Sequence, residues 1–327
     1  MGAPVVSICI PAFNAARYVA SAVESALRQS FRDLEVVIVD DASDDGTFEI
    51  LSQCADPRVR LFRNPRRLGH AHNRNRSVDL AAGSLVKFLD HDDILEPSCV
   101  AEMVEVFRRD SRVGFVFCRR RVLLQDETSE LGKLVAEGYA NLHLAFRALA
   151  DVNPGSDLLE QWIASGMRGN WIGEPSVVMV ARGLFERSTG FSDRIYQNLD
   201  VDLWMRLLGR THVGFIDKEL VHYRTGHESA SHTNYATGRA WLDRLWMLEH
   251  LAAALPPGSD PRVSAALRAE RRAAWRTVAK LGLALDRKRV PVVQYGRYVV
   301  HRAHAQLRSS RARLVTEPEA NRVNGRL

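Results

Sequence analysis

The chain of 327 residues carries a formal net charge of +6, and 46% of its residues are hydrophobic. This length and composition allow a substantial core, in one large domain or two smaller ones. No run of about 18 apolar residues occurs, so we expect no membrane-spanning helix. The opening stretch MGAPVVSICIPAF lacks a basic segment and a cleavage site, and we therefore expect no signal peptide.

The four cysteines are widely spaced and form no CxxC pair. This spacing indicates neither a zinc site nor a disulfide framework, and a reducing, cytoplasmic location fits it. Cys9 and Cys118 lie in apolar, strand-like runs, and we expect them to be small core residues.

The positive charge is concentrated at the C-terminal end. Residues 239–327 hold 18 Lys and Arg against 7 Asp and Glu, a balance of +11, which leaves −5 for the remainder. This asymmetry suggests an anionic partner such as a membrane surface, nucleic acid or an acidic subunit. The apolar residues after Pro291 recur at helical spacing among arginines. This pattern is compatible with a helix on an anionic membrane and with a solvated helix packed on the body.

Short apolar runs alternate with helical patterns through the first 120 residues. Buried strands alternating with helices predict an α/β fold with a doubly wound, mainly parallel sheet flanked by helices. Ligands bind such sheets beyond the carboxyl ends of the strands. We expect strands at Val5–Ile10, Leu34–Asp40, Val59–Asn64, 84–89 and 113–118, and helices at Ala16–Gln29, 45–55, 69–83 and 97–110.

The rest of the chain is less regular. We expect connecting helices and a loop over 119–168, then a strand and a helix over 175–191 and a short amphipathic helix over 200–210. From about Ala236 the pattern is helical to Leu255, is interrupted by LPPGSDP, and resumes through about Ala284. A last helical stretch follows Pro291.

Carboxylates are crowded at two expected strand ends. Asp90, Asp92 and Asp93 follow the apolar run SLVKFL, and Asp40 and Asp41 follow LEVVIV. Two unit charges about 4 Å apart repel by roughly 4 kcal/mol at an effective dielectric near 20. A divalent cation with oxygen ligands, or the hydroxyl and N–H groups of a nucleotide, would relieve this repulsion. A turn or helix-cap role is the alternative for any one Asp, but a cap needs only one carboxylate.

Other nucleotide and metal motifs are absent from the sequence. It contains no GxxxxGK[ST] and no GxGxxG after a strand, which argues against a P-loop or a dinucleotide site. It also contains no HExxH motif or His/Cys cluster typical of zinc.

Four segments together resemble family 2 glycosyltransferases of the GT-A fold, over roughly residues 5–231. They are VSICIPAFNAARYVASAVESALRQSF, EVVIVDDASDDGT, GHAHNRNRSVDLAAGSLVKFLDHDD and PSVVMVARGLFERSTGFSDRIYQNLDVDLWMRLL. The resemblance implies a catalytic domain over 1–235, with a nucleotide-sugar half over about 1–120 and an acceptor half over about 121–235. A basic helical extension would occupy 236–327.

The resemblance also implies roles for residues at the strand ends. The nucleotide base would be bound by Pro11, Ala12, Phe13 and Asp41, and the ribose and diphosphate side by Asp90 and Asp92.

Asp92 and Asp93 would hold a Mg²⁺ or Mn²⁺ ion, while Asp90 would also brace the loop. His91, between them, is expected to point away. Many relatives have Tyr-Arg-x-His; here His227 comes one position later and would approach the metal or diphosphate, unless it is an ordinary loop residue.

Asp200, in QNLDVDLW, matches the family's general base. Family members often have Glu-Asp there, whereas this chain has Leu199 before the aspartate. The implied reaction is a single in-line displacement with inversion, moving one sugar from a nucleotide-diphosphate sugar, a UDP-sugar by analogy, to an acceptor hydroxyl. The implied setting is bacterial-type surface glycan or glycolipid synthesis. The QxxRW motif and membrane spans of processive synthases are absent, so a non-processive enzyme is favoured.

Trp171 and Glu174 are the candidate acceptor contacts, with a core role for the Trp and a surface role for the Glu as alternatives. The acceptor would be a glycan, a lipid-linked molecule or a protein, and no nucleic-acid partner is expected. The enzyme would be cytoplasmic, with a peripheral contact to the inner face of the membrane.

Two other functions stay open at this point. A nucleotidyltransferase of related fold would show a Gly-rich loop after the first strand, where this chain has PAFNAAR. A nucleotide-sugar-binding protein without transfer activity is the second alternative, and the Leu199 departure favours it.

Overall fold

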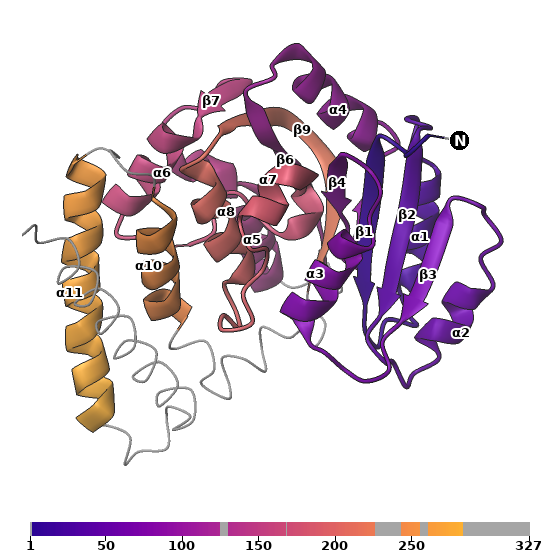
Figure 1. Cartoon of the computed structure of the whole chain (residues 1–327), viewed down its shortest axis with the longest axis horizontal. Helices are drawn as coiled ribbons and strands as arrows, with labels where there is room; N and C mark the ends of the chain where they lie inside the picture. The colour runs from indigo at the N-terminus through magenta and orange to yellow at the C-terminus, as the bar shows by residue number, and fades with distance from the viewer. Residues whose placement is uncertain (1, 125–129, 168, 226–242, 256–260, 284–327) are drawn as a thin grey trace, which may run out of the picture.

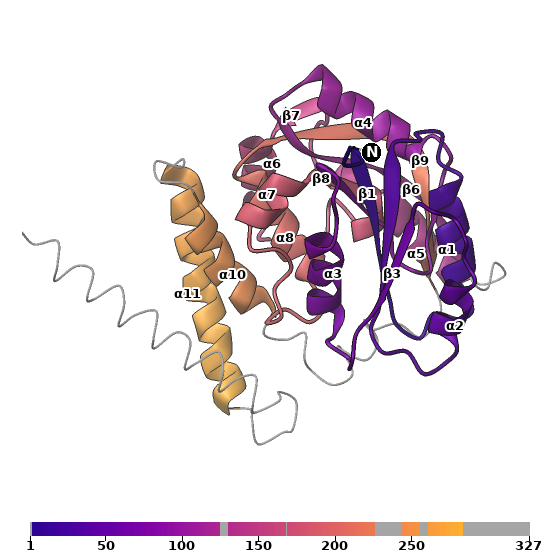
Figure 2. The same cartoon turned by 45° about the vertical axis from the view of Figure 1, so that its right-hand side comes forward.

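The computed structural model describes residues 2–124, 130–167, 169–225, 243–255 and 261–283. Its centre is a nine-stranded mixed sheet, and helices cover both faces (Figures 1 and 2). The strands are β1 (Val6–Ala12), β2 (Leu34–Asp40), β3 (Val59–Arg63), β4 (Leu85–Phe88), β5 (Ile94–Leu95), β6 (Val113–Leu124), β7 (Val152–Pro154), β8 (Val178–Ala181) and β9 (His212–Thr225).

Ten α-helices are described, together with two short 3-10 helices, Leu142–Ala145 and Pro175–Val177. Helices α1 and α3 lie on opposite faces of the parallel strands, which is the doubly wound arrangement (Figure 2). The α-helices are α1 (Val19–Leu27), α2 (Thr47–Ser52), α3 (His70–Asp79), α4 (Cys99–Arg109), α5 (Glu130–Ala140), α6 (Gly155–Ala164), α7 (Arg182–Arg187), α8 (Leu199–Leu208), α10 (Asp243–Ala254) and α11 (Pro261–Leu283).

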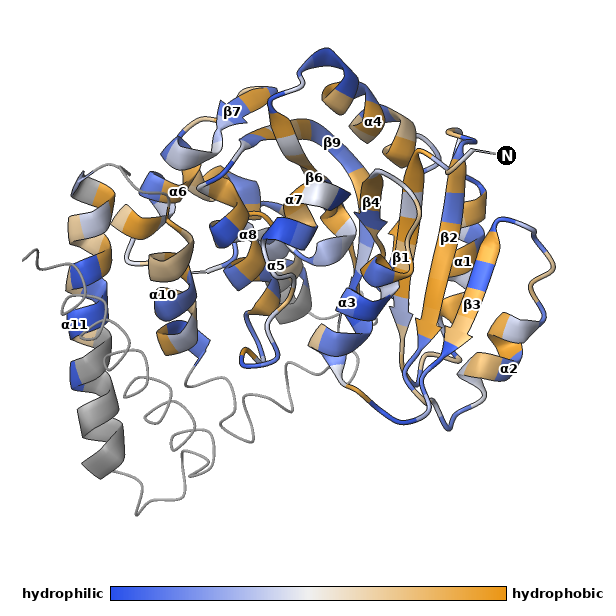
Figure 3. Ribbon diagram, in the orientation of Figure 1, coloured by the Kyte–Doolittle hydropathy of each residue, from blue (hydrophilic) through white to orange (hydrophobic). Residues whose placement is uncertain are grey.

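The strand order is β3-β2-β1-β4-β8-β6-β9-β5, and β7 pairs with β9. Strands β3, β2, β1 and β4 run parallel, while β8 pairs antiparallel with both β4 and β6. Every residue of β1 and β2 is buried, as expected for strands covered on both faces. Both strands are mostly apolar (Figure 3). The expected α/β fold with a central sheet flanked by helices is confirmed, and its parallel half is β3-β2-β1-β4.

The second half of the sheet differs from the expectation. Strand β6 does not end at Cys118 but continues to Leu124, because it pairs in parallel along β9 through two local register shifts near Arg119. The region expected to hold only helices and a loop also contains β7, which pairs antiparallel with β9. Strand β9 itself was not expected from the sequence, since its polar segment Asp217–Glu219 interrupts the apolar pattern.

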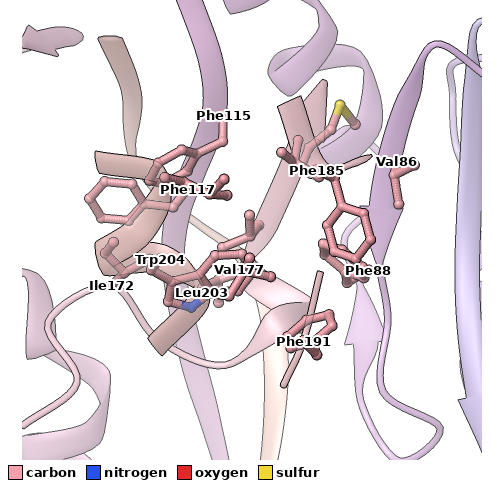
Figure 4. Packing of buried hydrophobic residues seen from close by; sticks show 14 of the residues in the cluster. Val86, Phe88, Phe115, Phe117, Ile172, Val177, Phe185, Phe191, Leu203 and Trp204 are labelled. Carbon is pink, nitrogen blue, oxygen red and sulfur yellow. The ribbon is translucent and has the colours of Figure 1, made fainter. Parts of the chain in front are cut away.

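An aromatic cluster fills the core between β4, β6 and α8 (Figure 4). Phe88 packs edge-on against Phe191, with ring centroids 5.5 Å apart, and Trp204 stacks on Phe115 at 6.2 Å. Both Phe88 and Trp204 are almost completely buried. Truncating a buried aromatic residue of this kind to Ala costs about 3–5 kcal/mol. The cluster therefore makes α8 a rigid part of the domain.

The two helices expected between about Ala236 and Ala284 are present as α10 and α11, which lie side by side (Figure 1). Helix α10 also packs against α8. No helix of the described residues is long and apolar enough to cross a membrane. The helical stretch expected after Pro291 lies outside the described residues.

Candidate functional site

The register of the parallel strands brings the sequence motifs together at one edge of the sheet. Ala12, which ends β1, pairs with Asp40 at the end of β2, and the Asp41 N–H donates to the Ala12 carbonyl at 2.8 Å. On the other side of β1, the Leu89 N–H donates to the Cys9 carbonyl at 3.0 Å. The segments that begin at Phe13, Asp41 and Asp90 therefore leave the sheet side by side.

A cleft opens at this edge. Five residues expected to contact the nucleotide line it, together with residues of α3 and of the loop before it. The lining residues are Pro11, Ala12, Phe13, Asp41, Arg67, Gly69, His70, Asn73, Arg74, Asp90 and His91.

Asp41 also fixes the chain that enters α3. Its Oδ1 accepts hydrogen bonds from the Asn64 amide at 2.7 Å and the Leu68 N–H at 2.8 Å, and its Oδ2 accepts the Gly69 N–H at 2.8 Å. Gly69 has φ of +92°, which glycine adopts without strain. The buried Asp41 carboxylate thus shapes the wall of the cleft.

The floor and rim of the cleft combine aromatic, imidazole and guanidinium groups. The Arg67 guanidinium lies 3.9 Å from the Phe13 ring centroid, a cation–π contact that gives this wall a flat, cationic surface. Nδ1 of His91 lies 3.1 Å from the Pro11 carbonyl oxygen. The expectation that His91 points away is therefore wrong, because its ring bridges the two strand ends.

Asp90 forms an ion pair with Arg74 of α3, with 2.6 Å between Oδ1 and Nη2. Both side chains are mostly buried. The Asp90 N–H also donates to Ser176 Oγ at 2.9 Å. Burial and then the Arg74 guanidinium lower the pKa of neighbouring His70 to about 4, so this imidazole is neutral at physiological pH. Asp90 braces the loop, as the sequence suggested for it.

Asp93 points into the protein. It is 1% exposed, and its Oδ1 accepts the Arg224 N–H from β9 at 2.9 Å. Its Oδ2 has no hydrogen-bond partner within the described part of the chain. Burial, with the carboxylates of Asp92 and Asp90, raises the pKa of Asp93 well above its usual range. The Arg224 guanidinium Nε donates to the Asp92 carbonyl at 3.1 Å, so the end of β9 adjoins both aspartates.

The donor chemistry of this corner fits a hard divalent cation, because a buried carboxylate oxygen is left unpaired beside two further carboxylates. Among the described residues, however, no three His, Cys, Asp or Glu side chains converge as a metal-binding group. His227, the third candidate ligand, lies outside the described residues, three positions after Arg224.

Asp200 lies in the first turn of α8. Its Oδ2 accepts a hydrogen bond from the Asn170 side chain at 2.9 Å, and its Oδ1 accepts the Val201 N–H at 2.8 Å. The pKa of Asp200 is raised to about 7, chiefly by burial and also by the Glu174 carboxylate, while the Val201 N–H and the Arg74 guanidinium oppose the increase. The Arg74 guanidinium that lowers this pKa is the one that pairs with Asp90. A carboxylate with this pKa can take up a proton near neutral pH.

The segment 170–174 presents Asn170 to Asp200 and is itself anchored from β6. The buried Arg120 guanidinium donates to the Ile172 carbonyl at 3.1 Å and forms an ion pair with Glu174. Gly173, at φ of +125°, lies against that guanidinium, and a Cβ at this position would collide with it. Glu174, expected to contact an acceptor, therefore has an internal partner.

Trp171, the other expected acceptor contact, is only partly buried. Its ring meets Phe146 edge-on, with centroids 5.1 Å apart. Sequence reasoning missed Asn170 and the cleft residues Arg67, His70 and Asn73. Nothing in the loop sequence RGNWIG indicates that Asn170 contacts Asp200. His70 and Asn73, in contrast, lie on the predicted helix just before the acidic motif, and this position could have indicated that they line the cleft.

The sequence and the structure both match known proteins. The model of Glycosyl transferase family 2 matches residues 7–156. An uncharacterized protein of Mycobacterium tuberculosis is 37% identical over 250 residues, which are 76% of this chain and 76% of that protein. The chondroitin synthase of Pasteurella multocida is 39% identical over 138 residues. These are 42% of this chain but only 14% of the synthase, so the chain spans a small part of that protein.

Two solved structures share the fold. S. aureus TarS 1–349 in complex with UDP-GlcNAc has a TM-score of 0.62 at 15% identity, covering 83% of this chain and 71% of that one. A mannosyltransferase from Pyrobaculum calidifontis in complex with GDP-Man and Mn²⁺ has a TM-score of 0.54 at 20% identity, covering 97% and 82%. These likenesses show the GT-A fold. With the family match and the 37%-identical relative, they establish that the chain belongs to the family 2 glycosyltransferases.

Proposed function

We propose that this glycosyltransferase moves one sugar from a nucleotide-diphosphate sugar to an acceptor hydroxyl, with inversion at the anomeric carbon, and that Asp200 is the general base. The carboxyl group of Asp200 carries the proposal. Its pKa of about 7 suits proton uptake near neutral pH, and the Asn170 hydrogen bond orients it.

The reaction follows from this placement. The acceptor oxygen attacks the anomeric carbon and forms the new C–O bond while Asp200 takes up the hydroxyl proton. The bond from the anomeric carbon to the diphosphate oxygen breaks, and the nucleoside diphosphate leaves with the electron pair. One displacement inverts the anomeric centre. General-base assistance of this kind typically contributes about 10²–10⁴-fold to the rate.

Asp92 and Asp93 are the proposed ligands of a divalent ion, Mn²⁺ or Mg²⁺, with His227 as a candidate third ligand. The unpaired Oδ2 of Asp93 supports this assignment. When bound, such an ion would neutralise negative charge on the leaving diphosphate. The mannosyltransferase of the same fold was solved with Mn²⁺.

The cleft beside Phe13 and Asp41 is proposed to take the nucleoside. Its backbone and side-chain oxygens suit a base N–H, the stacked Phe13 and Arg67 present a flat surface, and Asp90 and Asp92 suit the ribose and diphosphate side. The two structural neighbours were solved with different nucleotides, UDP-GlcNAc and GDP-Man. UDP-sugars are our first choice of donor, and the panel below includes GDP-sugars.

The test is Asp200→Asn, compared with the wild type on a panel of UDP- and GDP-sugars with Mn²⁺. Nucleotide release and product formation report transfer, and thermal shift or calorimetry reports donor binding. We expect transfer to fall by about 10²–10⁴-fold and donor affinity to change by no more than about twofold. Asp193→Asn, which neutralises an exposed aspartate of the preceding loop, is the matched control and should keep wild-type rates. Normal turnover by Asp200→Asn would place the base elsewhere.

The same panel separates the alternatives. A binding protein without transfer activity would bind a donor but release no nucleotide in the wild type, even with slow hydrolysis as the readout. A nucleotidyltransferase would produce diphosphate from a nucleoside triphosphate and a sugar phosphate. Membership of the family argues for sugar transfer over both.

Trp171 and Glu174 remain proposed acceptor-side residues, in a glycan, lipid-linked or protein acceptor of surface glycan or glycolipid synthesis. We also propose that the basic segment after Pro291 contacts an anionic membrane. Co-sedimentation with anionic liposomes should pellet the full chain better than a form that ends before Pro291. Equal pelleting of the two forms would rule this contact out.

A further inference from the structure

Asp243, the first residue of α10, is completely buried and binds the loop immediately before α8. Its Oδ1 accepts the Tyr196 N–H at 3.0 Å. Its Oδ2 accepts the Gln197 N–H at 2.6 Å, the Asn198 N–H at 2.9 Å and the Asn198 side-chain amide at 3.4 Å. One carboxylate thus binds three consecutive backbone N–H groups, two residues ahead of Asp200.

These bonds fix the loop that leads into α8 and the backbone N–H of its N-cap residue. Asn198 occupies the N-cap position of α8, but its side chain makes no capping hydrogen bond to that helix. The side chain donates to Asp243 instead. The conformation at Tyr196–Asn198 sets the direction in which the first turn of α8 begins, and Asp200 lies in that turn. Burial raises the pKa of Asp243, and the N–H groups of this loop oppose the increase. Its two oxygens accept four hydrogen bonds from Tyr196–Asn198, which fix the loop on α10.

Helix α10 is held in place by a second contact, two turns after Asp243. Nδ1 of His250 lies 2.8 Å from Oδ1 of Asp202 on α8. Oδ2 of the same aspartate binds Arg206 at 2.8 Å, and that guanidinium donates to the Gly190 carbonyl at 2.6 Å. His250 follows Asp243 by seven residues, and Asp202 follows Asn198 by four. Helix α10 is therefore tied to α8 through Asp202 and to the loop before α8 through Tyr196–Asn198, two residues ahead of Asp200.

We propose that Asp243 is a positioning residue for Asp200, through which the C-terminal helical extension supports the catalytic site. The inference rests on the proposed role of Asp200 as the base. It assigns to the start of α10 a function separate from any membrane contact of the segment after Pro291: it holds the carboxylate of Asp200 at the angle that the acceptor hydroxyl requires.

The test variant is Asp243→Asn, which keeps the size of the side chain. One carboxylate oxygen becomes an NH₂ group, which must then face backbone N–H donors. We expect kcat to fall by about 10–100-fold, since a misplacement near 1 Å can cost about 10²-fold, while KM for the donor stays near its wild-type value. The acid limb of the pH–rate profile should also shift relative to the wild type, because moving Asp200 changes its burial and hydrogen bonds and therefore its pKa.

Deuterium exchange gives a readout that needs no activity. Peptides covering residues 196–201 should exchange faster in Asp243→Asn than in the wild type, because the oxygen that becomes NH₂ no longer accepts hydrogen bonds from these amides. Leu251→Ala is the matched control, since Leu251 is a buried residue of the same helix. It should lower Tm without moving the pH–rate profile or the exchange of 196–201. If Asp243→Asn does not fold, Asp243→Ser, which keeps one acceptor oxygen, takes its place in the same measurements.

The outcomes separate the two proposals. Unchanged exchange of 196–201 in a folded Asp243 variant would overturn the inference, as would faster exchange with unchanged kcat and pH profile. Full turnover by Asp200→Asn would instead reject the proposed base. Faster exchange in Asp243→Asn would then show that Asp243 braces the loop but would end its role in positioning a catalytic group.

Discussion

The side-chain amide of Asn170 donates a hydrogen bond of 2.9 Å to Oδ2 of Asp200. The other end of this amide accepts the N–H groups of Ile172 at 3.2 Å and Gly173 at 2.8 Å. Because two backbone donors fix the amide oxygen, the NH₂ group must point at Asp200. Asn170 can therefore only donate a hydrogen bond to Asp200, and this bond favours the ionised form of the carboxylate.

Replacing Asn170 by Ala should lower kcat by about 10–100-fold, because a hydrogen bond to a charged group is worth about 1.5–3 kcal/mol. KM for the donor should change little. The acid limb of the pH–rate profile should move to higher pH, since the ionised carboxylate loses a donor. Asn141→Ala is the control, because its side chain donates to the nearby Glu137 carbonyl at the surface, away from Asp200. Wild-type rates and an unmoved acid limb in Asn170→Ala would remove this residue from the site.

The pH dependence of transfer should follow the ionisation of Asp200. Its pKa of about 7 means that the base form is scarce below neutral pH. We expect kcat/KM to rise about tenfold per pH unit below pH 7 and to level off above it. The profile is measured over roughly pH 5.5–8.5 with a fixed metal concentration, and Asp193→Asn should reproduce it. An acid limb near the ordinary aspartate value of about 4 would contradict the assignment.

Asp200 should also make stability depend on pH. Its folded-state pKa, raised to about 7, lies above the usual value of 3.8. Its contribution to stability is therefore fully present below the unfolded pKa and is lost as the pH rises through about 7. Asparagine cannot ionise, so Asp200→Asn should gain Tm relative to the wild type at about pH 8 but not at about pH 4. An equal Tm difference at both values would show that ionised Asp200 is not destabilising.

The convergence of the residues proposed to bind the nucleotide could be predicted from the sequence, because local pattern and register agree there. Asp41 and Asp90 each follow an apolar strand, and parallel strands place their carboxyl ends at one edge. Even so, the sequence did not predict the ring of His91 in the cleft. Its contact with the Pro11 carbonyl depends on a residue 80 positions away.

The surroundings of Asp200, the proposed base, were less predictable because tertiary contacts build them. Asp200 could be recognised by its motif, but its pKa depends on burial and on Glu174. Strand β9 could not be predicted, because the polar segment Asp217–Glu219 interrupts its apolar pattern. Asp243 looks like an ordinary acidic residue in the first turn of a helix, and nothing local shows that it binds a loop 45 residues earlier.

The acidic corner yields the last prediction. Asp93 is buried and leaves Oδ2 without a hydrogen-bond partner among the described residues, and an unpaired buried carboxylate oxygen is costly unless a cation or donor completes it. We expect Asp93→Ala and Asp92→Asn each to weaken donor binding by about tenfold or more in the presence of Mn²⁺. Asp93→Ala should not differ from the wild type once EDTA removes the metal, whereas Asp92→Asn should keep the part of the loss that comes from the proposed ribose contact. Calorimetric titration of the donor, with and without Mn²⁺, measures both conditions.

The control is Asp79→Asn, at the exposed end of α3, which should bind the donor as the wild type does. Donor affinity that is the same with and without Mn²⁺ in the wild type would exclude a metal-dependent donor site, and an unaffected Asp93→Ala would exclude Asp93 alone from the metal ligands.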